Sequence, residues 1–178
     1  ERRFFRFELE VERLSGTADI LPVIAAEDVL MEADLFAGGR FFVEGQIRSF
    51  NSRAESGRRL IISVFAETVT TTEQPPQNDA ALTGAICKPP IYRRTPLGRE
   101  ICDVMLAVPR QYQRTDYIPC ILWGRTAQCA ADLPVGAQIA LTGRLQSRGY
   151  VKVLPEGAEE RTAYELSAME LEILEENF

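Results

Sequence analysis

Apolar and polar residues alternate along most of the chain, and this period of two predicts β-strands rather than helices. The alternation is clearest at residues 5–13, 41–50, 60–69, 101–108, 117–123, 138–146 and 163–174. Two short helices are expected at residues 27–36 and 126–133. Polar stretches at residues 52–59 and 154–161, each with a glycine, are predicted to be hairpin loops.

The two halves of the chain share a pattern that indicates an internal repeat. The motifs DLxxG and GxIxS at residues 34–49 recur as DLxxG and GxLxS at residues 132–147, an offset of 98. The motif DxLPxI at residues 19–24 recurs as DxIPxI at residues 116–121, an offset of 97 that also relates Arg13 to Arg110. A constant spacing with one single-residue slip predicts two copies of one β module.

Each copy runs strand, strand, short helix, glycine-led strand, loop, strand, which is the order of the five-stranded Greek-key barrel called the OB-fold. We therefore predict an all-β chain of two tandem OB-folds, each with a short helix between strands 3 and 4. The first OB-fold is expected at residues 1–70, a polar, proline-containing linker at 71–80 and the second OB-fold at 81–178. Strands of the second copy are predicted at residues 82–92, 98–110, 116–123, 136–153 and 162–174.

The first copy has no room for its first strand, because only 18 residues precede Asp19. A barrel without one strand would leave unpaired edges. We therefore expect roughly 20 residues before Glu1, or a strand supplied by another chain.

The composition argues against an enzyme. There is no histidine, which removes the commonest general base and metal ligand together with the Ser-His and Cys-His dyads. The 4 cysteines form no CxxC spacing, so no zinc site is predicted. The sequence has neither a P-loop nor a GxSxG motif. We expect no catalytic residues, no metal and no other cofactor.

The cysteines and the hydropathy also bear on where the protein works. Cysteines within apolar strand segments are typical of free thiols in a reducing cytoplasm, where we expect the protein to be located. No apolar run approaches the roughly 20 residues of a membrane span, so no membrane partner is expected.

Positive charge is concentrated in the second copy. The whole chain has a net charge of −6, but residues 88–152 contain 10 basic and 4 acidic residues, which is +6 locally and leaves −12 elsewhere. All but 2 of the 20 basic residues are arginine, whose planar fork suits phosphates and bases. This asymmetry favours nucleic acid as a partner, with a solvated basic face as the alternative.

The run DYIPCILWGRTAQCAADLPVGAQIALTGRLQSRGY at residues 116–150 resembles the bacterial single-stranded DNA-binding protein family, which includes primosomal replication protein N-like members. The preceding MLAVPR at residues 105–110 resembles the family's second strand, and VEGQIRS at residues 43–49 resembles the same pattern in the first copy. The resemblance implies an OB-fold that binds single-stranded DNA.

Such binding needs flat aromatic surfaces for unpaired bases, and the alternation in residues 117–123 supplies candidates. Ile118, Cys120 and Leu122 make one wholly apolar side, which suits the core better. Tyr117 and Trp123 are therefore expected on the outer side. A core position for the single tryptophan is the alternative.

The resemblance implies that both of these rings stack on bases. It implies the same for Tyr150, expected at the start of the loop between strands four and five, and for Tyr112, which lies near a fourth stacking position of the family. Phosphate contacts are expected from arginines of the turn between strands one and two and of the later strands, with solvated hairpin charge as the alternative. These arginines are Arg93, Arg94, Arg99, Arg110, Arg114, Arg144 and Arg148.

The first copy lacks aromatic residues at the three matching positions, which hold Ile20, Ala26 and Ser52. We therefore expect a scaffold or dimerisation module with at most weak DNA contact, whose outer strand face is apolar and forms an interface. Its remaining candidates for phosphate contact are Arg48, Arg53, Arg58 and Arg59.

The family resemblance also implies partners. Four barrels would come together in a homodimer with C2 symmetry. Replication or repair proteins are possible partners, and the chain end EENF at residues 175–178 faintly resembles the family's acidic recruiting tip.

The leading interpretation is sequence-tolerant binding of single-stranded DNA, mainly through the second OB-fold, in replication, repair or mobile-element transfer. One alternative is an interaction or scaffold module of a replication or conjugation assembly with weak or no DNA binding. Another is binding of single-stranded RNA, which the OB-fold also supports.

Overall fold

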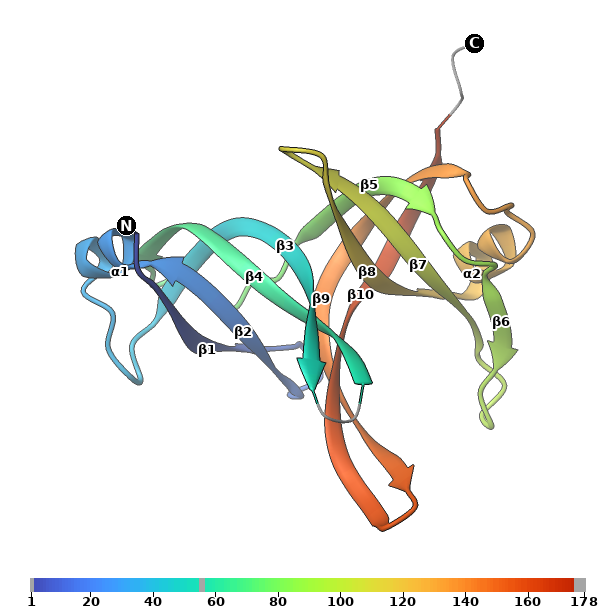
Figure 1. Ribbon diagram of the computed structural model, residues 1–178, viewed down its shortest axis with the longest axis horizontal. Coiled ribbons are helices and arrows are strands. Elements are labelled where there is room, and N and C mark those ends of the chain that lie inside the picture. The colour runs from blue at the N-terminus through green and yellow to red at the C-terminus, as the bar shows by residue number, and fades with distance from the viewer. Residues whose placement is uncertain (1, 55–56, 175–178) are drawn as a thin grey trace. The chain divides into compact units, whose positions relative to one another are not determined.

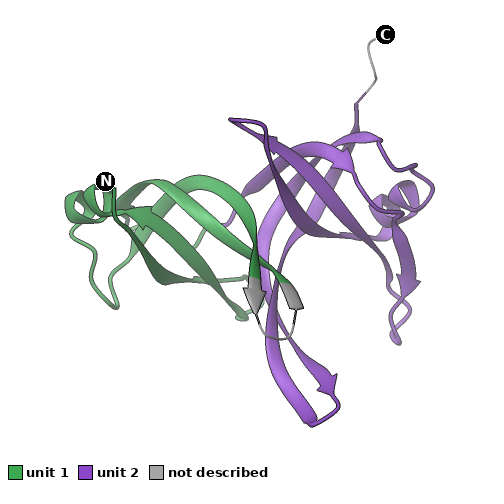
Figure 2. Cartoon of the chain, viewed as in Figure 1, with its two compact units in different colours: residues 1–77 green, residues 78–178 purple. Residues whose placement is uncertain are grey.

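The computed structural model describes residues 2–54 and 57–174. The tail predicted to recruit partners, residues 175–178, lies outside the described residues, as do the side chains of Arg53 and Arg58. The chain forms two compact units, Glu1–Gln77 and Asn78–Phe178 (Figure 2), and each is described by itself. No helix within the described residues has the length and apolar character needed to cross a membrane.

Unit 1, residues 1–77, is a four-stranded sheet with one short helix, and its strand order is β1-β2-β4-β3 (Figure 1). Strands β2 and β4 are parallel and the other neighbours are antiparallel. Its buried centre includes Val23, Ala25, Ala66 and Val69. The elements are β1 (Phe4–Glu12), β2 (Ala18–Ala26), α1 (Glu27–Ala33), β3 (Phe41–Ala54) and β4 (Gly57–Thr71).

Unit 2, residues 78–178, contains a closed ring of five strands. The sheet order is β5-β9-β10-β8-β7-β6, and an additional pairing of β5 with β7 closes the ring (Figure 1). Large aliphatic side chains from these strands fill its interior, among them Leu106, Ile118, Ile139 and Leu166. The elements are β5 (Ala80–Ile86), β6 (Ile91–Arg94), β7 (Glu100–Arg110), β8 (Arg114–Trp123), α2 (Gly124–Ala131), β9 (Gln138–Leu154) and β10 (Gly157–Ile173).

Matched positions of the two units make the same contacts. Arg13 binds Asp19 at 2.7 Å in unit 1, and Arg110 binds Asp116 at 3.1 Å in unit 2. A side chain at Gly45 would collide with the β4 backbone, and a side chain at Gly143 would collide with the β10 backbone in the same way. Glycine is therefore required at both positions by the close approach of two backbones.

Several predicted boundaries were wrong for local reasons. The strand predicted at residues 82–92 is divided into β5 and β6, because Pro89 and Pro90 have no backbone N–H for a strand ladder. Helix α1 ends at Ala33 instead of residue 36, since Asp34 is in the left-handed conformation. Helix α2 begins at Gly124, two residues earlier than predicted.

The two predicted hairpin loops are strand over most of their length. Pairing in unit 2 extends to Leu154 and Gly157, so the turn is confined to residues 155–156 and the two strands form a long ribbon (Figure 1). Pairing in unit 1 extends to Ala54 and Gly57. A two-stranded ribbon exposed on both sides needs no buried apolar face, so polar composition alone wrongly suggested loops.

Candidate nucleic-acid interface

The candidate site is the side of four unit 2 strands that faces away from the interior. The register places Asp103 beside Ile121, Ile121 beside Ser167, and Ser167 beside Arg144. Because side chains alternate along each strand, every second residue joins this surface. We call it the outer face; it consists of Asp103, Met105, Tyr117, Pro119, Ile121, Trp123, Arg144, Gln146, Arg148, Tyr150, Glu165 and Ser167, together with Arg93 and Arg99, which contact Asp103 and Trp123.

Strand β8 has the orientation that the sequence predicts. Ile118 and Leu122 are completely buried and Cys120 is nearly so, while Tyr117 is 41% exposed and Trp123 is half-buried. Burial raises the pKa of the Cys120 thiol, which keeps it protonated. One detail differs: Ile121 belongs to the outer face but is 4% exposed, because neighbouring outer-face side chains cover it.

Trp123 is fixed to the sheet surface by a polar contact and a cation. Its indole Nε1 donates a hydrogen bond to Ser167 Oγ at 3.0 Å. The Arg99 guanidinium lies 4.9 Å from the ring centroid. Both contacts position the ring outside the aliphatic interior. The attraction between the guanidinium and the face of the ring stabilises this position.

A hydrogen-bonded network links the arginines of β9 to β10. Arg148 donates to Glu165 Oε1 at 3.0 Å, and Gln146 Nε2 donates to the same carboxylate at 3.0 Å. Arg144 donates to Gln146 Oε1 at 3.4 Å. The hydrogen bond that Arg148 donates to Glu165 is the main cause of a raised pKa of Arg148, which remains a cation. Glu165 is itself buried, so it holds Arg148 against the sheet.

The two arginines at residues 93 and 94 lie on opposite sides of β6. Arg93 pairs with Ile101, the residue of β7 that is paired with Trp123, and binds Asp103 at 2.9 Å. Arg94 instead binds Glu100 at 3.2 Å, and Gln128 of α2 donates to the same carboxylate. Hydrogen bonding, first from Tyr92 and then from Gln128, lowers the pKa of Glu100. Arg94 therefore does not join the outer face.

Three other predicted site residues also lie away from this face. Arg110 contacts the buried Asp116 on the opposite side of its strand, and Arg114 pairs with Arg110 across the hairpin. Tyr112 occupies the turn between them, 90% exposed and with a φ of 63° that a tyrosine rarely adopts. These three residues can contact nucleic acid only if the DNA strand continues beyond the outer face.

The sequence did not predict the position of Tyr150 or the part that three buried polar residues play in the site. Tyr150 was expected at the start of a loop, but it lies within β9 and pairs with Arg161. Gln146, Glu165 and Ser167 were not predicted as site residues, although each contacts one that was. The polar residues of E-x-S at 165–167 indicated that Glu165 and Ser167 share one side of their strand. Which residues they contact depends on the β9–β10 register, which the sequence does not specify.

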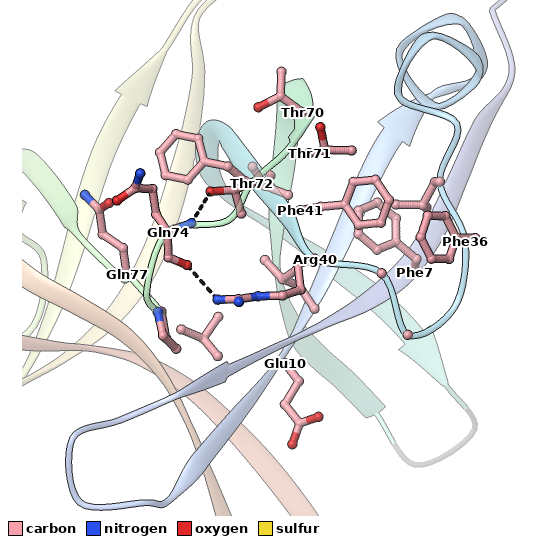
Figure 3. Close-up of a pocket in the computed structure, with 18 of the residues that line it drawn as sticks. Phe7, Glu10, Phe36, Arg40, Phe41, Thr70, Thr71, Thr72, Gln74 and Gln77 are labelled. Carbon is pink, nitrogen blue, oxygen red and sulfur yellow. Dashed lines mark hydrogen bonds between the residues drawn. The ribbon is translucent and has the colours of Figure 1, made fainter.

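A pocket of about 820 Å³ is lined by residues of unit 1. It is bordered by β1, β3 and residues 35–40 and 70–77 (Figure 3). Arg40 crosses it and donates to the Gln74 carbonyl at 2.6 Å. The pocket is bordered by β1 and β3, and the strands of unit 2 that correspond to these two, β7 and β9, both pair with β5. No cluster of potential metal ligands occurs among the residues that the structure describes.

Comparison with known proteins agrees with the predicted family. The model of the single-strand binding protein family matches residues 77–174, more than half of the chain. The chain belongs to this family. The match covers nearly all of unit 2, including every residue of the outer face.

Curated members of the single-strand binding protein family align with less than half of the chain. Single-stranded DNA-binding protein 1 of Lactococcus lactis is 34% identical over 80 residues, covering 41% of this chain and 53% of that protein. The single-stranded DNA-binding protein of Caldanaerobacter subterraneus is 35% identical over 78 residues, covering 40% and 52%. The chain thus spans about half the length of these relatives.

Solved structures extend the likeness in fold to both units. A deletion mutant of the single-stranded DNA binding protein from Thermus aquaticus superposes with a TM-score of 0.76 at 21% identity, covering 100% of this chain and 89% of that one. The wild-type protein gives a TM-score of 0.71 at 22% identity, covering 98% and 81%. The family and the mainly β fold predicted from the sequence are confirmed.

Proposed function

We propose that this protein binds single-stranded DNA with little sequence preference, chiefly through the outer face of unit 2. The observation that carries the proposal is the presence of Tyr117, Trp123 and Tyr150 on one sheet surface, together with Arg93, Arg99, Arg144 and Arg148. Membership of the single-strand binding protein family supports this ligand.

The rings supply affinity that is independent of sequence. Each base stacked on an aromatic side chain contributes about 1–3 kcal/mol, and every base offers such a surface. Trp123 is fixed by Ser167, so little conformational entropy is lost when a base stacks on it.

The arginines contribute less than their number suggests. Asp103 and Glu165 lie among the four arginines, which leaves a local charge of +2 (four minus two) on the outer face. A phosphate would share or displace these carboxylates at Arg93 and Arg148. Pre-positioned arginines cost less entropy on binding, but the acids reduce the attraction for a polyanion.

We further propose that the two units are tandem OB-folds, with residues 1–70 and 81–178 as domains and 71–80 as the linker. The closed ring in unit 2 and the matched contacts of unit 1 support this assignment. A homodimer would bring four such units together, and C2 closure is the commonest arrangement for two copies. A role in replication, repair or mobile-element transfer is part of this proposal.

The test is the double variant Tyr117→Ala with Trp123→Ala, assayed by anisotropy of a labelled oligo-dT strand. If both rings stack, binding weakens by roughly 2–6 kcal/mol. Tyr92→Ala is the matched control, because Tyr92 lies on the other side of its strand. Wild-type affinity in the double variant would refute the assigned face. Matched RNA as competitor separates a DNA binder from an RNA binder.

A further inference from the structure

Unit 1 carries aromatic residues on its outward sheet side that the sequence comparison with unit 2 did not reveal. The register places Arg6 beside Ile24, Ile24 beside Phe65, and Phe65 beside Gln46. This side corresponds to the outer face of unit 2, since Ile24 matches Ile121. We call it the unit 1 face; it includes Phe4, Arg6, Ile20, Ile24, Arg48, Phe50 and Phe65.

In unit 1 the aromatic ring lies on the strand next to the one that corresponds to the Trp123 strand of unit 2. In unit 2, Ile121 pairs with Ser167, and Trp123 donates its hydrogen bond to that serine. In unit 1, Ile24 pairs with Phe65, so a phenylalanine stands where unit 2 has the serine. The position matching Trp123 holds the small Ala26. The large and the small residue are thus exchanged between two adjacent strands, and a ring remains on the surface.

The unit 1 face also has the cation that accompanies the ring in unit 2. The Arg48 guanidinium lies 3.8 Å from the Phe65 ring centroid, as Arg99 lies over Trp123. Phe4 lies 5.8 Å from Phe65, centroid to centroid, and Arg2 is 5.9 Å from the Phe4 ring. Two rings and two cations therefore form one continuous group.

Solvent reaches this group. Phe4 is 47% exposed, Phe50 is 48% exposed and Ile20 is 45% exposed. The predicted apolar side of β2 is apolar, but the sheet surface around it is not, because Arg6 of β1 and Arg48 of β3 lie on the same side. Cations stacked on aromatic rings suit unpaired bases joined by phosphates better than they suit an apolar protein surface.

We propose that the unit 1 face is a second base-stacking site for single-stranded DNA, centred on Phe4, Phe65 and Arg48. The ligand class rests on the proposed function of unit 2. Glu8 and Glu10 lie farther along β1 on the same side, so the DNA strand passes over the end of the sheet that carries Phe4. The earlier expectation that this copy is mainly a scaffold does not account for the exposed rings.

The experiment uses the full chain with Tyr117→Ala and Trp123→Ala, which silences the outer face of unit 2. At low salt, this variant should retain weak binding of labelled oligo-dT. Adding Phe65→Ala should reduce the residual affinity by roughly 5- to 150-fold, the range for one stacked base. Phe36→Ala is the matched control, because Phe36 is exposed in unit 1 and packs on Phe41 away from this face. It should change nothing.

A second readout does not depend on a folded variant. Ultraviolet cross-linking of wild-type protein to oligo-dT should yield adducts on peptides that contain Phe4 or Phe65. Adducts confined to unit 2, or no residual binding after unit 2 is silenced, would overturn this proposal while leaving the proposed function intact. If wild-type protein bound no oligo-dT, both would fail. Loss of an oligomer in Phe65→Ala with unchanged DNA affinity would make the face a protein interface instead.

Discussion

Arginine side chains of unit 2 are engaged by carboxylates from neighbouring strands, and their value for binding depends on these partners. Arg93 binds Asp103, Arg148 binds Glu165, and Arg94 binds Glu100. Only the first two pairs lie on the outer face. The sequence identifies which residues carry charge, but the side of the strand and the strand register decide which charges meet a ligand.

The adjacent residues Arg93 and Arg94 offer a matched comparison. Arg93→Ala should lower the slope of log affinity against log salt concentration by up to about 0.7, the value for one phosphate contact on a single strand. Arg94→Ala should leave the slope unchanged, because its side chain lies on the other side of β6. Titrations of oligo-dT at several salt concentrations provide the measurement. Equal effects of the two variants would show that the DNA does not distinguish the two sides of this strand.

Burial separates a structural ion pair from those of the outer face. Asp116 is buried and binds Arg110, so Asp116→Ala leaves a cation without its partner. We expect a loss of about 2–3 kcal/mol in the free energy of unfolding, below the roughly 3–5 kcal/mol of fully buried pairs because Arg110 stays partly exposed. Asp103→Ala, at a solvent-accessible pair, should cost less than about 1 kcal/mol. Urea unfolding compares them, and equal losses would contradict the structural role.

At the scale of the elements, the β9–β10 hairpin extends beyond the ring of unit 2 as a two-stranded ribbon (Figure 1). Val151 and Val153 are exposed on it, so its outer part contributes nothing to the core. Tyr150 lies at the base of this outer part. The ribbon's composition is what made it resemble a loop in the sequence.

Shortening the ribbon tests where the site ends. Replacing residues 152–159 by Asn-Gly keeps the Val151–Glu160 pair and supplies a turn suited to a two-residue hairpin. We expect a nearly unchanged melting temperature, since no core residue is removed, and an oligo-dT affinity within about threefold, since Tyr150 and Arg148 remain. Circular dichroism and anisotropy measure both. A large loss of affinity with an intact fold would mean that the outer ribbon contacts DNA.

Strand interiors could be predicted from the sequence, but boundaries and partners could not. The alternation around Cys120 correctly separated its two sides, because a half-buried strand must keep apolar residues on one of them. The break at Pro89 and Pro90 was readable in principle, since proline cannot donate to a ladder. The contacts of Glu165 and the position of Phe65 depend on pairing between distant strands, which no local pattern specifies.

At the scale of the molecule, basic residues are in excess only in part of unit 2, whereas aromatic side chains lie on sheet surfaces of both units. The net charge of −6 would repel a polyanion, so the proposed binding of DNA requires the local excess of basic residues between residues 88 and 152. Aromatic surfaces occur on the corresponding sheet sides of both units, built on different positions. A repeat can thus conserve the chemistry of a surface while its individual residues change, which position-by-position comparison misses.

The most direct test of the central claim is the fluorescence of Trp123, the single tryptophan of the chain. Titration with oligo-dT at low salt should quench its emission to saturation, because a base stacks on the exposed part of the indole, and added salt should restore the emission. If emission stayed unchanged at oligonucleotide concentrations where anisotropy shows the strand bound, the outer face of unit 2 would not be the binding site.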